Sequence, residues 1–333
     1  MDIKLRDEIW HEARQTIAYD GFYGRASLSQ PRFSPSSIHY SIAYARQHAA
    51  GRSLFLLTDT DLSGLALDIP VIHDPDNVTM ASSLFLLAFH ADDRMLAMAR
   101  KILANGGKIM GLRSPYWSFP PARYFHQNGL AREVLEKEAE SDLLHFDSAD
   151  FENIFQALEL TRDVPGDYVE IGVYKGARAK AALHYMALSR IHRPTWLLDT
   201  FEGMSGEFTE QSAEAGWDGR FPDYSLEEVQ QRLMEYPQAK LVRANIVHEP
   251  LPDEIERIAV AHIDVDILEA TSAALSKVHA KMSPGGIIIM DDQGHTPMLC
   301  GAYIALRDFL DGPEGGSYRT IHFPTGQAFL LRR

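Results

Sequence analysis

The sequence has few of the features that mark disulfide-linked, secreted or membrane proteins. Its single cysteine, Cys300, cannot form a disulfide within the chain. The longest apolar runs, at residues 53–57 and 286–290, are far shorter than the roughly 20 residues that cross a bilayer. The first residues are charged and show no apolar core followed by a small-residue cleavage site. We therefore expect a protein of the reducing cytoplasm with no membrane partner.

Runs of basic residues are also absent, which bears on nucleic acids. The formal net charge is −14 and is uneven, because residues 1–140 carry −1 and the remainder carries −13. An acidic surface repels a phosphate backbone unless a local basic patch compensates. We therefore expect no nucleic-acid partner.

The length of 333 residues fits two domains. In the first, residues 1–140, short apolar stretches at 53–58, 69–73 and 108–113 are typical of strands. Residues 80–104 are predicted to form one or two helices, so this part favours a small α/β domain with a parallel sheet. An aromatic and proline-rich loop is expected at 114–128, and a charged connecting helix at 131–144.

The second domain, residues 150–333, alternates strands and helices more clearly. A helix at 150–160 is followed by expected strands at 167–171, 195–198, 240–243, 259–263 and 286–290. Helices are expected between them at 177–189, 225–235, 270–281 and 298–310, and a final strand pair at 320–323 and 328–331. This order predicts a Rossmann-like, doubly wound α/β sheet whose ligands lie beyond the carboxyl ends of the strands.

The first of these strands leads into a glycine-containing turn. Gly172 and Gly176 let the backbone approach a ligand closely, and Tyr174 lies between them. Glu170, at the strand end, suits the amino group of a cofactor's methionine part. The spacing of the two glycines differs from the G-x-G-x-x-G fingerprint of dinucleotide sites. A simple packing turn is the alternative interpretation of this segment.

A second acidic residue, Asp199, ends the next strand and is followed by Thr200. An acid at this position can accept hydrogen bonds from both ribose hydroxyls of a nucleoside. Because no pyrophosphate cradle accompanies it, S-adenosylmethionine fits better than NAD.

Three further carboxylates belong to two later strand ends. Asp264 follows the strand at 259–263, and Asp291 and Asp292 follow the strand at 286–290. Carboxylates crowded at one sheet edge repel one another unless a cation or a proton intervenes, and oxygen ligands of this kind select Mg²⁺ or a similar ion. A metal also helps a hydroxyl lose its proton, which makes it a better acceptor of a methyl group. The alternative is that the Asp pair only begins a loop or caps a helix.

Two residues are candidates for the general base that accepts the substrate proton. They are Asp266, two residues after Asp264, and His295, in the loop after the Asp pair. His295 is as readily interpreted as a loop histidine without a role. His262, inside a strand, is predicted to be a buried histidine, and no nucleophilic role is expected for Cys300.

Four segments in this order resemble the macrocin O-methyltransferase family: residues 169–176, 198–203, 262–266 and 283–292. The resemblance implies a class I methyltransferase sheet and methylation of sugar hydroxyls of natural products. By position it implies cofactor contacts from Glu170, Gly172 and Asp199, and an adenine contact from Asn245. It implies that the metal ligands are Asp264, Asp291 and Asp292. Further cofactor contacts are predicted for Tyr174, Gly176, Thr200 and Asp264.

Three positions depart from the pattern of that family. Val265 stands where the family usually has glycine, Leu268 where an aromatic residue is common, and Gln293 where tyrosine is frequent. These departures lie where a substrate is expected, so they leave the identity of the acceptor open.

Residues 1–140 lie outside the resemblance. This domain could bind the acceptor, could form a homo-oligomer, or could be a second enzyme through Asp59, Asp61, His73, Asp74 and Asp76. We favour a non-catalytic role, because these residues are more simply turn and cap residues. For the whole chain, the alternatives to an O-methyltransferase are a non-catalytic binding scaffold and a nicotinamide-dependent dehydrogenase.

Overall fold

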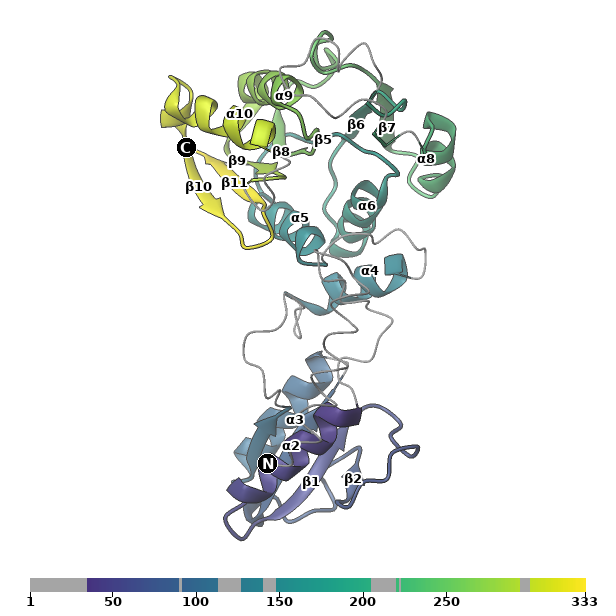
Figure 1. The fold of residues 1–333 in the computed structure, drawn as a ribbon, viewed down its shortest axis with the longest axis vertical. Helices are drawn as coiled ribbons and strands as arrows, with labels where there is room; N and C mark the ends of the chain where they lie inside the picture. Colours follow the sequence, from purple (N-terminus) through teal and green to yellow (C-terminus); the bar gives the residue numbers. More distant parts are fainter. Residues whose placement is uncertain are drawn as a thin grey trace. The chain divides into compact units, whose positions relative to one another are not determined.

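The structure is a computed structural model that describes residues 35–89, 92–112, 127–139, 148–204, 220–221, 223–293 and 300–333 (Figure 1). The chain divides into two compact units. One comprises residues 1–140 and 145–148, and the other comprises residues 141–144 and 149–333. Within the described part of the chain, no helix combines the length and the apolar character needed to cross a membrane.

The first unit contains a four-stranded parallel sheet in the order β2-β1-β3-β4. Its elements are α2 (Pro35–His48), β1 (Ser53–Thr58), β2 (Val71–Ile72), the 3-10 turn η2 (Met80–Ser82), β3 (Ser83–Ala88), α3 (Asp92–Ala104), β4 (Lys108–Gly111) and α4 (Gly129–Ala139). Ile38 and Ile42 of α2 share a core with Leu56, whereas Ile102 of α3 shares another with Leu57. Because neighbouring strand residues point to opposite faces, α2 and α3 cover opposite faces of the sheet.

The prediction of one or two helices across residues 80–104 was wrong for the segment that forms β3. All six residues of β3 are buried, and the strand pairs with β1 on one side and β4 on the other. A strand covered on both faces has no polar alternation, so its apolar run looks like part of a buried helix. The strand expected at 69–73 shortens to Val71–Ile72, since Pro70 has no N–H to donate to a ladder.

Two predicted segments can be followed only in part. The connecting helix expected at 131–144 is α4, which begins at Gly129 and is described to Ala139. Most of the aromatic loop expected at 114–128 falls outside the described residues.

The second unit contains a seven-stranded sheet in the order β10-β11-β9-β8-β5-β6-β7 (Figure 1). Its elements are α5 (Ser148–Leu160), β5 (Asp167–Ile171), α6 (Ala177–Ser189), β6 (Thr195–Asp199), α8 (Leu226–Arg232), β7 (Ala239–Arg243), β8 (Ile258–Ile263), α9 (Leu268–Lys281), β9 (Met282–Met290), α10 (Cys300–Asp311), the 3-10 turn η4 (Gly315–Ser317), β10 (Tyr318–His322) and β11 (Ala328–Arg332). Strands β5 to β9 are parallel, and β11 and β10 join antiparallel. The predicted Rossmann-like, doubly wound sheet is confirmed.

Helices cover both faces of this sheet. Val169 and Ile171 of β5 share a core with Leu275 of α9 and Leu306 of α10. On the α5 and α6 side, Phe155 stacks on Tyr185 with ring centroids 4.5 Å apart. The alternation along β5 therefore sends Val169 toward one helical layer and leaves Tyr168 and Glu170 facing the other way.

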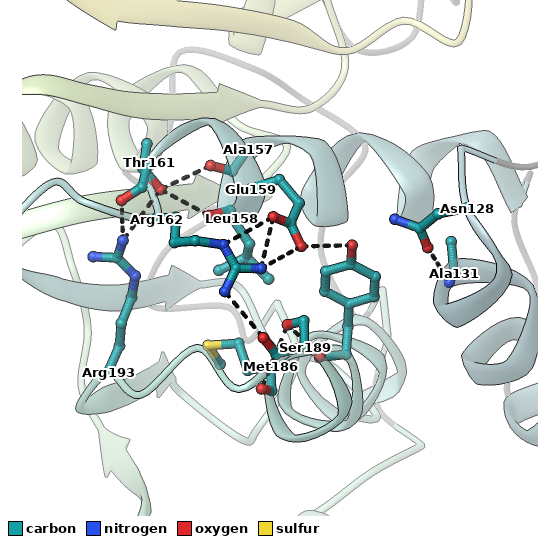
Figure 2. A network of polar contacts seen from close by, with 11 residues as sticks. Asn128, Ala131, Ala157, Leu158, Glu159, Thr161, Arg162, Met186, Ser189 and Arg193 are labelled. Atoms are coloured by element: carbon teal, nitrogen blue, oxygen red, sulfur yellow. Dashed lines mark hydrogen bonds and ion pairs between the residues drawn. The ribbon is translucent and has the colours of Figure 1, made fainter.

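A polar network ties the carboxyl ends of α5 and α6 together (Figure 2). Glu159 accepts hydrogen bonds from Arg162 and from the Tyr185 hydroxyl, and Arg162 also donates to the Ser189 carbonyl. Arg193 donates to the carbonyl oxygens of residues 161, 164 and 166 in the loop before β5. These contacts lie at the amino ends of the parallel strands, so they hold the scaffold at the end away from the predicted ligand site.

Candidate functional site

Strand pairing brings the predicted site residues to one edge of the sheet. Ile171, the last residue of β5, pairs with Leu198 of β6 and with Ile263 of β8. Ile263 in turn pairs with Met290, the last residue of β9. The residues at or just beyond these strand ends are Gly172, Asp199, Asp264 and Asp291. Four separate segments of sequence thus meet at the carboxyl edge, where doubly wound sheets bind their ligands.

The glycine turn fits closely against β8. Gly172 has a φ of +88°, and a Cβ placed there would lie 1.8 Å from the carbonyl oxygen of Asp264. Its N–H donates to the Leu198 carbonyl at 3.0 Å. Gly176, with a φ of +78°, is the N-cap of α6. Glycine is therefore required at position 172 by both the backbone conformation and the approach of the neighbouring strand.

Asp199 organises the turn through its carboxylate. Oδ2 accepts the N–H groups of Val173 and Tyr174 at 2.7 and 2.9 Å. Oδ1 accepts the N–H of Phe201 and the hydroxyl of Tyr224, both at 2.8 Å. A carboxylate offers about four acceptor positions. A ligand hydroxyl must share or replace one of these donors. The side-chain donors are the Tyr224 hydroxyl and, at 3.4 Å from Oδ1, the Thr200 hydroxyl.

Aromatic side chains surround Asp199. Tyr174 contacts Tyr224 and Phe221 edge to face, with ring centroids 5.0 and 5.4 Å apart. Burial, followed by the charge of Asp199, raises the pKa of Tyr224, so this hydroxyl stays protonated and donates. Tyr224 was not predicted from the sequence, because it follows a segment with no regular pattern.

Thr200 and Asn245, both predicted cofactor contacts, shape turns at the same edge. The Thr200 hydroxyl donates to the Gly203 carbonyl at 3.2 Å. The Asn245 side-chain oxygen accepts the Val247 N–H at 3.0 Å and so fixes the turn after β7. Lys277 of α9 donates to carbonyl oxygens in the same turn, including that of Glu249 at 2.7 Å.

The carboxylates form two groups that share Asp264. Oxygens of Asp264, Asp266 and Asp292 lie within 4.8 Å of one another, and the same holds for ligand atoms of Asp264, Asp291 and His262. The predicted metal ligands Asp291 and Asp292 therefore fall into different groups. Asp292 has a positive φ of 65°, so its side chain leaves the backbone in a different direction from that of Asp291.

A buried arginine contacts the second group. Arg178, in the first turn of α6, reaches Asp264 Oδ2 with Nη1 at 2.5 Å and Asp291 Oδ2 with Nη2 at 3.0 Å. Nη2 is also 3.9 Å from Asp150 Oδ2. The Arg178 side chain is 12% exposed and that of Asp291 is 6% exposed. Sequence reasoning missed this contact, since nothing in the sequence pairs a helix residue with two distant strand ends.

The environments of the acidic residues differ in their effect on protonation. Burial, followed by the charge of Asp264, raises the pKa of Asp266 to about 7. Burial and the charge of Asp266 also raise the pKa of Asp292. Burial alone would raise the pKa of Asp291, but Arg178 and His262 hold it below its usual value. The repulsion among Asp264, Asp266 and Asp292 is therefore relieved either by a proton or by a cation.

His262 links the two sides of the site beneath the surface. The histidine is fully buried, with Nδ1 3.6 Å from Glu170 Oε2 and Nε2 3.5 Å from Asp291 Oδ2. Burial alone would lower its pKa, but these two carboxylates raise it to about 10. Glu170 also accepts the Tyr168 hydroxyl at 2.6 Å. The prediction of a buried histidine is confirmed, and Glu170 faces this row of polar side chains.

Backbone strain is concentrated at the same edge. Tyr174, Phe201, Asp266 and Asp292 have φ values of 48°, 56°, 60° and 65°. Each non-glycine residue in this region costs about 1–3 kcal/mol, so such residues persist where the surrounding structure or function requires them. Their gathering beside Asp199 and Asp264 supports a functional site. His295, the other predicted base, lies outside the described residues.

A divalent cation fits one of the two carboxylate groups. Asp264, Asp266 and Asp292 are half-exposed and offer the hard oxygen ligands that Mg²⁺ prefers. The other group already contains the guanidinium of Arg178. The residues that could hold a cation are therefore Asp264, Asp266 and Asp292.

Comparison with known proteins agrees with the motifs. Residues 149–311 match the family described as "Macrocin-O-methyltransferase (TylF)". A Streptomyces olivaceus protein, 8-demethyl-8-(2,3-dimethoxy-alpha-L-rhamnosyl)-tetracenomycin-C 4'-O-methyltransferase, is 30% identical over 154 residues, which are 40% of this chain and 55% of the relative. Demethyldecarbamoylnovobiocin O-methyltransferase of Streptomyces niveus is 29% identical over 172 residues, which are 45% and 60% of the two chains. This chain thus matches little more than half the length of these relatives.

Solved structures with similar chains include two methyltransferases. The O-methyltransferase NovP is 24% identical with a TM-score of 0.47, over 56% of this chain and 81% of its own. The calicheamicin methyltransferase CalS11 is 20% identical with a TM-score of 0.46, over 62% and 87% of the two chains.

Proposed function

Because residues 149–311 match the macrocin O-methyltransferase family, we propose that this chain transfers a methyl group from S-adenosylmethionine to a hydroxyl group of a sugar or another small natural product. The observation that carries the proposal is the convergence of the glycine turn, Asp199 and three carboxylates at the ends of β5, β6, β8 and β9. This combination supports a nucleoside-binding site beside a site for the acceptor hydroxyl.

The cofactor is assigned to the side of β5, β6 and β7. Asp199 accepts the ribose hydroxyls, Gly172 and Gly176 let the turn approach the methionine part, and Asn245 contacts the adenine. Tyr174, Thr200 and Glu170 line the same side, where Glu170 suits the amino group. The support is positional, since these residues lie at the carboxyl ends of β5 and β6 or in the turns that follow β5, β6 and β7.

The acceptor is assigned to the side of β8 and β9, with Mg²⁺ or a similar ion held by Asp264, Asp266 and Asp292. A divalent ion bound there would lower the pKa of the acceptor hydroxyl. Asp266 is one candidate to take the hydroxyl proton, through whichever of its carboxylate oxygens does not contact the ion. The oxygen then bonds to the methyl carbon as the carbon–sulfur bond breaks, and S-adenosylhomocysteine leaves. His295 is the second candidate for the base.

The first unit is assigned an accessory role, in binding the acceptor or in forming a homo-oligomer. Its acidic residues serve local structure: Asp61 accepts the Ser63 N–H at 2.9 Å, and Asp74 accepts that of Asp76 at 2.9 Å. Such turns are the ordinary role of Asp. Light scattering after gel filtration of the full chain measures the oligomeric state, and a cytoplasmic location is part of the same proposal.

The test is methyl transfer from radiolabelled S-adenosylmethionine to a panel of glycosides and nucleotide-activated sugars, with products identified by mass spectrometry. A labelled methyl group on a sugar oxygen supports the proposal. Cofactor binding without transfer to any acceptor favours the non-catalytic scaffold. Binding of NADH in place of S-adenosylmethionine favours the dehydrogenase.

Replacing Asp199 by alanine is expected to raise the Kd for S-adenosylmethionine about 10- to 100-fold. The change removes charged hydrogen bonds worth about 1–3 kcal/mol together with the acceptor of two turn amides. Isothermal titration calorimetry measures the Kd. Tyr224→Phe is the matched control, since it keeps the ring and removes only the competing hydroxyl, and it should bind at least as tightly. An unchanged Kd for Asp199→Ala would place the ribose contact elsewhere.

A further inference from the structure

The acidic centre contains a positive charge that belongs to the chain itself. Arg178 projects from the first turn of α6 and contacts Asp264 and Asp291 at 2.5 and 3.0 Å. Both contacts use Oδ2 of the carboxylate, and the guanidinium is largely buried. A guanidinium presents its N–H groups as a rigid fork, which suits the bridging of two carboxylates.

Arg178 therefore neutralises the inner part of the centre without an added ion. Asp291, the most buried of the four aspartates after strands β8 and β9, lies between Arg178 and His262. A cation at Asp291 would have to displace the guanidinium. A cation at Asp264, Asp266 and Asp292 would share Asp264 with it, and two positive groups that share one carboxylate repel each other.

We propose that Arg178 is an internal counter-ion of the acidic centre, which keeps Asp291 out of the metal site and weakens divalent-ion binding at Asp264, Asp266 and Asp292. The inference rests on the cation site of the proposed function and adds the residue that sets its affinity. With Arg178 in place, Asp264 and Asp291 keep a cationic partner when no divalent ion is bound. Arg178 is a positioning residue, because it acts through Asp264 and Asp291.

The test is direct Mn²⁺ binding to the full chain, without cofactor or acceptor, by calorimetry and by electron paramagnetic resonance. Arg178→Gln is expected to lower the Kd for Mn²⁺ at least about 10-fold, since it removes the competing charge beside Asp264. Asp292→Asn should raise the Kd at least about 10-fold, whereas Asp291→Asn should change it less than about 3-fold. Arg162→Gln, which removes an ion-paired arginine at the other end of the sheet, should keep the wild-type Kd.

The outcomes separate this inference from the proposed function. A folded Arg178→Gln protein whose Kd equals or exceeds that of the wild type overturns the inference. The inference is also overturned if Asp291→Asn raises the Kd for Mn²⁺ as much as Asp292→Asn does. Mn²⁺ binding by Arg178→Gln but not by the wild type supports the counter-ion role, while it removes the divalent ion from the proposed mechanism. Absence of methyl transfer to any acceptor leaves these Kd comparisons intact.

Loss of Arg178 leaves two carboxylates without their cation, so folding needs its own measurement. If Arg178→Gln does not unfold cooperatively by circular dichroism, millimolar Mn²⁺ should restore cooperative unfolding, because the ion replaces the missing charge. Potassium at matched ionic strength should not restore it. Failure of Mn²⁺ to restore folding overturns the inference.

Discussion

Asp292→Ala is expected to reduce methyl transfer at least about 100-fold while the Kd for S-adenosylmethionine stays within about 3-fold of wild type. Asp292 belongs to the half-exposed carboxylate group on the acceptor side, whereas the turns assigned to the cofactor follow β5, β6 and β7. The substitution removes one of three oxygen donors from that group. Initial rates of label transfer and calorimetry of cofactor binding measure the two quantities separately.

Two controls make this result specific. Asp253→Ala changes an exposed aspartate of the same unit and should retain full activity. Treatment of the wild type with a chelator should mimic Asp292→Ala, and added Mg²⁺ should restore the wild type only. Equal activity of wild type and Asp292→Ala in chelator-treated buffer would contradict the role of the cation.

Gly172→Ala is expected to destabilise the second unit by about 2–5 kcal/mol and to abolish cofactor binding. The positive φ alone costs an alanine about 1–2 kcal/mol. The added Cβ would also lie 1.8 Å from the Asp264 carbonyl oxygen, so the ends of β5 and β8 must separate. Overpacking of this kind typically costs about 1–3 kcal/mol more.

Chemical denaturation followed by circular dichroism measures the loss of stability. Gly316→Ala is the matched control, because no atom lies within 4 Å of a Cβ built there, and its stability should change by less than about 0.5 kcal/mol. Wild-type stability of Gly172→Ala with unchanged cofactor affinity would mean that the turn does not fit against β8 as described.

The sequence predicted the second unit better than the first for a physical reason. Strands β5, β6 and β8 are short apolar stretches with a glycine or an aspartate at or just after the strand end, so both their length and their composition indicate strands. In the first unit, β3 follows a short 3-10 turn and precedes α3, and its fully buried run merges with helical sequence on both sides. Strand β9 also begins earlier than predicted, at Met282, because it pairs with Ile258 before a shift in register.

The site was predictable in outline and not in detail. Adjacent parallel strands bring Asp264 near Asp291 and Asp292, and the order of elements alone gives that result. The division of Asp291 and Asp292 between two groups depends on the direction of each side chain after the strand ends. The contacts of Arg178 and Tyr224 join segments 86 and 25 residues apart, and no local pattern specifies such pairs.

The antiparallel addition of β11 and β10 has a consequence for how copies of this chain could associate. The outermost strands of the seven-stranded sheet are β10 and β7, and both display basic side chains in a chain of net charge −14: Arg319 and His322 on one, Lys240 and Arg243 on the other. Charged side chains on outer strands oppose the pairing of one sheet with another. An oligomer of this protein would therefore not continue the seven-stranded sheet from one subunit to the next.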